Sequence, residues 1–235
     1  MTGIALVLYA LAVAQARRIP LVLHAAAFSQ TLPALAGLRY GRRLPAPRVW
    51  TIAWCIALVV TDGLQLWLRG SSGNNNLWLR AASAPIQNSI MLWTLSLWQS
   101  HQVSRLAFRI AIPIFLVTLL ALIPTVRETS SFNVVAGPFQ ALLLLAGALY
   151  TLVRNAARDP EGITRHDWFW ITLGASLYFG LRVALPPFAA FLVQQYPELV
   201  RLAYLLQAWT DIAAFLIIAR GIWCPLPQAR SGGFF

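Results

Sequence analysis

The chain has 235 residues, of which 59% are hydrophobic and only 11% charged, whereas soluble domains carry about a quarter charged residues. Its net charge is +11, and all 18 basic residues are arginines. This composition excludes a water-soluble fold and leaves no polar domain that could bind nucleic acid. We expect the arginines to lie in loops, where they orient helices and meet anionic headgroups of the lipid bilayer.

Seven apolar stretches predict an all-α, polytopic transmembrane helical bundle, because only a helix pairs its own backbone groups within one segment in lipid. The stretches cover residues 19–38, 49–68, 77–99, 106–123, 134–153, 168–193 and 199–222. We expect one transmembrane domain over residues 19–223 and a short cytoplasmic tail over 224–235. Prolines within the spans should bend or locally open helices, and Thr164–Asp167 has the form of a capping box for the sixth helix.

Residues 1–18 form a short apolar N-terminal segment whose role stays open. Its apolar part, residues 3–14, is too short to span comfortably. Ala12-Val13-Ala14 has the small-x-small form of a signal-peptide cleavage site, but the basic start of such a peptide is missing. The segment could be cleaved, extend the first helix or form a short extra span.

The arginines predict the orientation. Loops after the first, third, fifth and seventh spans carry eleven arginines, and the other loops carry four. The positive-inside rule then places the C-terminus in the cytoplasm of a multi-pass protein in the inner (plasma) membrane. Arg17 and Arg18 oppose this assignment, because they would lie outside.

Polar residues inside the spans are the candidate site, because burying them in lipid is costly. At 1.5 Å per residue, they share a layer from the midplane toward the outer leaflet. We expect them to form an outward-open ligand or ion pocket, built from Asp62, Gln65, Gln87, Asn88, Tyr178, Arg182, Gln207 and Asp211. The alternative is structural: Arg182 pairs with Asp62 or Asp211, and the amides join helices. Asn75, Asn76 and Trp78 cap the third helix and anchor the interface, or form an outer lid.

Cofactor and enzyme motifs are absent from the sequence. His24 is the only histidine inside a span, which leaves no facing pair for haem. Retinal needs a lysine, and no Cys/His spacing suits a metal. Hydrolase motifs are missing as well. We therefore expect no cofactor, no metal site and a non-enzymatic role, with an intramembrane enzyme using Asp62 and Asp211 as the least favoured alternative.

Several strings resemble an uncharacterised group of small bacterial seven-helix integral membrane proteins. They are Asn75-Asn76-Leu77-Trp78, Pro85-Ile86-Gln87, Leu92-Trp93, Asp167-Trp168-Phe169-Trp170 and Leu177-Tyr178-Phe179. The resemblance extends over most of residues 19–223 and implies topology but no activity. Gln87 stands where that group often has glutamate, which weakens any transfer of a proton or cation role.

These observations favour an outward-facing ligand sensor or an accessory subunit that assembles with other membrane subunits. A small-solute or ion transporter with a midplane polar site is the alternative. In either case, we expect Asp211→Asn to alter activity more than folded yield, because asparagine nearly keeps the shape of aspartate and removes its charge.

Overall fold

The computed structural model describes residues 19–72, 77–122, 129–159, 162–192 and 196–225. These residues form an all-helical bundle, as the sequence predicts, with no strand among them. The elements are α2 (Ile19–Ser29), α3 (Leu32–Leu38), η1 (Gly41–Arg43), α4 (Ala46–Ser72), α5 (Leu77–Leu97), α6 (Gln102–Leu122), α7 (Thr129–Ala156), η2 (Ile163–Arg165), α8 (Asp167–Leu192) and α9 (Pro197–Ile222). The segment 1–18, most of the predicted tail, Asn75 and Asn76 lie outside the described residues.

The first predicted span is a broken helix. The sequence analysis expected one helix over residues 19–38, but α2 ends at Ser29 and α3 begins at Leu32. Pro33 explains the break, because it has no N–H to donate and its ring clashes with the carbonyl of the preceding turn. At the break, the Thr31 hydroxyl donates to the Phe28 carbonyl at 2.7 Å. The break leaves Gln30 between two helical ends.

The other expected prolines do not interrupt their helices. Pro85, Pro113, Pro138 and the pair Pro186–Pro187 lie inside α5, α6, α7 and α8, which stay helical throughout. Neighbouring helices in a bundle allow this, because they can satisfy the carbonyls that proline leaves free.

The capping box predicted at Thr164–Asp167 does not form. Thr164 belongs to the short helix η2, and its carbonyl accepts a hydrogen bond from the Trp170 indole at 2.7 Å. Asp167 is itself the first residue of α8, where its Oδ1 accepts from the Trp168 amide at 2.8 Å. The other carboxylate oxygen of Asp167, Oδ2, accepts a hydrogen bond from Arg48.

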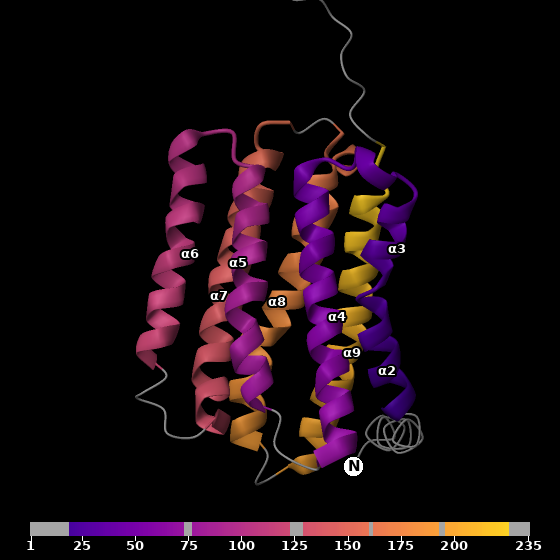
Figure 1. Ribbon diagram of the computed structural model, residues 1–235, viewed down its shortest axis with the longest axis vertical. Coiled ribbons are helices and arrows are strands. Elements are labelled where there is room, and N and C mark those ends of the chain that lie inside the picture. The colour runs from indigo at the N-terminus through magenta and orange to yellow at the C-terminus, as the bar shows by residue number, and fades with distance from the viewer. Residues whose placement is uncertain (1–18, 73–76, 123–128, 160–161, 193–195, 226–235) are drawn as a thin grey trace, which may run out of the picture.

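The helices run alternately up and down, so their loops gather at two ends of the bundle (Figure 1). α8 packs along both α7 and α9, while α4 packs on α5, and the broken column α2–α3 packs on α9. α6 packs mainly on α5 and meets α7 only marginally. We call the end that holds the end of α3, the start of α4 and the end of α9 the arginine-rich end; it is uppermost in Figure 1 and includes Arg39, Arg43, Arg48, Arg105, Arg154, Arg158, Arg165 and Arg220.

Aromatic rings from three helices form the centre of the core. Trp54 of α4 is 1% exposed and contacts Tyr178 and Phe179 of α8 and Phe215 of α9, with ring centroids 5.4 to 6.0 Å apart. Gly174 lets α8 and α9 approach closely, since a Cβ there would lie 2.7 Å from the Ala214 carbonyl oxygen. Small residues at helix crossings are how membrane bundles gain packing contacts.

Six of the helical columns are long and apolar enough to cross a membrane: α2–α3 together, α4, α6, α7, α8 and α9. Large hydrophobic side chains on their outer surfaces are exposed, among them Leu106, Val117, Leu142, Phe188 and Leu206. Such a surface requires lipid around it. The protein is therefore a multi-pass helical membrane protein.

Candidate functional site

A helix break and a carboxylate meet on one side of the bundle. Gln30 is buried between α2 and α3, and its amide Nε2 donates to Asp62 Oδ2 on α4 at 2.8 Å. Among the described residues, the side-chain oxygen Oε1 of Gln30 has no hydrogen-bond partner. The contact thus joins the broken column to α4 and leaves an acceptor beside the carboxylate.

Two amide contacts continue from α4 toward α7. The Gln87 amide donates to the Thr61 hydroxyl at 2.9 Å, next to Asp62 in the chain. Asn88, the following residue of α5, donates its side-chain amide to Gln140 Oε1 of α7 at 2.9 Å. Polar side chains therefore link α4 to the α2–α3 break and to α5, and link α5 to α7.

An ion pair joins α8 to α9. Arg182 of α8 donates through Nη2 to Asp211 Oδ2 of α9 at 3.1 Å, one of the two pairings that the sequence analysis left open. The guanidinium carbon also lies 4.1 Å from the Tyr178 ring centroid, a cation–π contact. Asp62 lies within electrostatic range of the same guanidinium.

We call these residues the polar layer: Gln30, Thr61, Asp62, Gln87, Asn88, Gln140, Tyr178, Arg182 and Asp211. Its charges do not balance, since it holds two carboxylates and one guanidinium. Asp211 makes the direct contact with Arg182, whereas the hydrogen bond of Asp62 comes from a neutral amide. Among the residues that the structure describes, no cationic side chain forms an ion pair with Asp62. Such a half-buried carboxylate is suited to binding a cation, because an uncompensated charge in a membrane is costly.

Two remaining candidates lie on the helices that carry Asp62 and Asp211. The side chains of Gln65 and Gln207 are half-buried on α4 and α9, and Gln207 lies one turn from Asp211. Asn75, Asn76 and the Trp78 side chain lie outside what the structure describes, so the predicted lid stays a prediction. Within the described ranges, no three His, Cys, Asp or Glu side chains gather as a metal site would require.

Sequence reasoning missed a second polar cluster at the arginine-rich end. The Arg48 side chain is 1% exposed, and its Nε donates to Asp167 Oδ2 at 2.9 Å. Its Nη1 donates to the carbonyls of Ile222 and Cys224, at 3.1 and 2.7 Å, and its Nη2 to that of Pro225 at 3.2 Å. The Tyr40 hydroxyl donates to the Trp223 and Cys224 carbonyls.

We call this cluster the Arg48 lock. It joins the start of α4 to the start of α8, and it satisfies carbonyls that the end of α9 leaves free. One signal in the sequence could have suggested it. A cation in the first turn of a helix opposes the helix dipole, so Arg48 at the start of the second span needed an acidic partner.

Cys224 belongs to the same cluster and is buried. Burial raises the pKa of its thiol, and a thiol becomes less reactive as its thiolate becomes scarcer. The geometry therefore favours a structural thiol at this position over a reactive one.

No protein-family model, curated protein or solved structure matches this chain. The resemblance to the group of seven-helix bacterial proteins therefore stays a prediction.

Proposed function

We propose that this protein is a non-enzymatic integral membrane protein that binds a small cation at the polar layer, acting as an outward-facing ligand sensor or as an accessory subunit of a membrane assembly. The observation that supports the proposal is the arrangement around Asp62. Its carboxylate accepts from the Gln30 amide at 2.8 Å, while Arg182 is engaged by Asp211 at 3.1 Å. Asp62 is thus the negative charge that a cation would meet.

A sensor needs the binding site to affect a distant part of the fold. α4 carries Asp62 in its second half and Arg48 in its first turn, while α9 carries Asp211 and ends in the carbonyls that Arg48 binds. A cation that shifts α4 against α9 would therefore change the Arg48 lock. Such coupling requires that the two arrangements differ in affinity for the ligand.

Transport is the second candidate, and the broken column favours it. Discontinuous helices often supply substrate and ion sites near the bilayer midplane in secondary transporters. The α2–α3 break brings Gln30 to Asp62, which is the arrangement such a site would use. A flux of the bound cation into proteoliposomes of the purified protein would favour transport, whereas co-purification with a partner subunit would favour the sensor or accessory role.

The orientation is part of the proposal. We take α5 as the seventh span, since it has the same 21 residues as α6 and packs between α4, α6 and α7. The excess of loop arginines then supports an inner-membrane protein whose arginine-rich end and C-terminus face the cytoplasm. Gln30 and Asp62 would be reached from outside.

A topology measurement checks this orientation. A reporter fused after Phe235 should be active in the cytoplasm, and one inserted within residues 70–74 should be external. The bias of loop arginines is the physical reason. Exchanging the two reporters provides the control, and a cytoplasmic signal from residues 70–74 would overturn the outward-facing site.

Replacing Asp62 with asparagine should abolish cation binding and leave the bundle folded, since the Gln30 amide still finds an oxygen acceptor. For the wild type, a cation at about 100 times its Kd should raise the free energy of unfolding by about 2.7 kcal/mol. Thermal unfolding in detergent with Na⁺, K⁺ or small alkylammonium ions measures this effect. Asp62→Asn should show no stabilisation.

The matched control is Glu198→Gln, which removes an exposed acidic charge from the first turn of α9. It should retain the full stabilisation. If Asp62→Asn is stabilised by the same cations as the wild type, the site lies elsewhere.

A further inference from the structure

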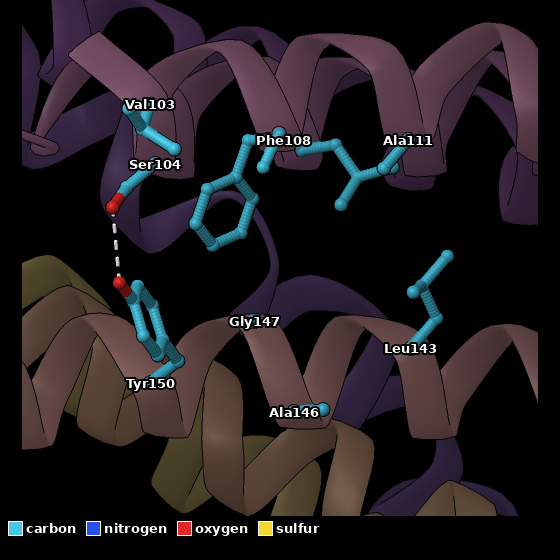
Figure 2. Close-up of a pocket in the computed structure, with 10 residues that line it drawn as sticks. Val103, Ser104, Phe108, Ala111, Leu143, Ala146, Gly147 and Tyr150 are labelled. Carbon is cyan, nitrogen blue, oxygen red and sulfur yellow. Dashed lines mark hydrogen bonds between the residues drawn. The ribbon is translucent and has the colours of Figure 1, made fainter.

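The loose packing of α6 leaves an apolar groove at the surface of the bundle. The groove has a volume of about 450 Å³ and lies between α6 and α7, and Leu92 of α5 also lines it. Figure 2 shows Phe108 and Leu143 directed into the space between the two helices. α6 meets α7 only marginally because it packs on α5 instead.

Small residues keep the groove open. Ala107 and Ala111 line it from α6, and Ala146 and Gly147 line it from α7. A Cβ at Gly147 would lie 2.9 Å from the Phe108 ring, so that position has no room for a side chain. Ala107 and Ala146 are exposed, so the groove opens outward to the surroundings of the bundle, which for this protein are lipid chains.

One end of the groove is polar and positively charged. The hydroxyls of Ser104 and Tyr150 lie 3.0 Å apart there (Figure 2), and Arg154 donates to both. Arg158 lies within electrostatic range of the Tyr150 hydroxyl. Neither α6 nor α7 contains an acidic residue, and Asp159, just beyond α7, pairs with His166 at 2.8 Å.

We propose that this groove binds one anionic phospholipid, with its phosphate at Ser104, Tyr150 and Arg154 and an acyl chain between Phe108 and Leu143. The order of chemistry along the groove matches that of the lipid, from a charged end at the arginine-rich side to an apolar end within the bundle. A second helix is the poorer occupant, because a helix with its side chains is about 10 Å wide and would leave the arginines without counter-charges.

The two arginines of α6 are engaged elsewhere, which leaves the charge at this end of the groove to Arg154 of α7 and to Arg158 just beyond it. Arg105 donates to the Gln99 carbonyl at 2.9 Å. The Arg109 guanidinium carbon lies 4.6 Å from the Trp93 ring centroid, whereas Arg154 donates to the Ser104 and Tyr150 hydroxyls that line the groove. Arg109→Gln is therefore the matched control for Arg154→Gln, since both remove one arginine near the same end.

The experiment uses the whole protein in nanodiscs made from equal amounts of phosphatidylglycerol and phosphatidylcholine with identical acyl chains. Native mass spectrometry after release should find one phosphatidylglycerol retained in preference to phosphatidylcholine. Arg154→Gln should reduce that preference about fivefold, the effect of losing one arginine near a charged surface. Arg109→Gln should leave it unchanged.

A second variant tests the apolar half without touching the charges. Ala146→Phe places a ring in the groove from an exposed position and should lower retention of both lipids, while the protein keeps its thermal midpoint. The proposal is overturned if phosphatidylcholine is retained equally, if Arg109→Gln has the same effect as Arg154→Gln, or if Ala146→Phe leaves retention unchanged. A dimer that dissociates with Ala146→Phe would assign the groove to a second copy instead.

Discussion

Replacing Arg48 with methionine should lower the free energy of unfolding by about 3–5 kcal/mol, the cost of breaking one side of a buried ion pair. Arg48 is 1% exposed and supplies the cation opposite Asp167. Its guanidinium also satisfies the carbonyls of Ile222 and Cys224. Methionine nearly keeps the side-chain volume but donates no hydrogen bond, so the decrease in the free energy of unfolding measures the contribution of the polar contacts. Thermal or denaturant unfolding of the purified protein in detergent measures it.

Arg43→Met is the matched control, because Arg43 is exposed in η1 at the same end of the bundle. Its free energy of unfolding should change by less than about 0.5 kcal/mol, as is usual for surface positions. Adding Asp167→Asn to Arg48→Met should recover part of the loss, since the uncompensated carboxylate is removed. Equal stability of Arg43→Met and Arg48→Met would contradict the lock.

Asp211→Asn should lower the free energy of unfolding by about 3 kcal/mol or more, which changes the expectation drawn from the sequence. That expectation placed the main effect on activity. The structure gives Asp211 a direct contact with Arg182 at 3.1 Å in a side chain that is only 10% exposed, so the substitution leaves a guanidinium without its nearest counter-charge. The measurement is the thermal midpoint of the variant against the wild type in the same detergent.

The double variant Asp211→Asn/Arg182→Gln provides the test of cause. It should be more stable than Asp211→Asn alone, because the uncompensated cation is gone. Asp62→Asn, by comparison, should retain stability and lose cation binding. A stable Asp211→Asn variant that no longer binds cations would make Asp211 the ligand residue and Asp62 its support.

The candidate site was partly visible in the sequence because polar residues are rare in apolar spans. Asp62, Gln87, Asn88, Arg182 and Asp211 stand out for that reason, and their depth follows from the rise of a helix. Their partners do not follow from depth. Whether Arg182 meets Asp62 or Asp211 depends on the rotation of three helices, and the sequence left both open. Gln140 was missed because it was read only as part of an apolar span.

The sequence by itself determined the helical class, the membrane setting and the approximate ends of the helices, because lipid allows only helices over apolar stretches of that length. Only the tertiary structure decided which helices and side chains are neighbours. The α2–α3 break, the Arg48 lock and the groove beside α6 depend on which helix faces lie together, and periodicity carries little of that information when most faces are apolar. Arg48 and Asp167 are 119 positions apart in the chain, and only the packing of α4, α8 and α9 makes them partners.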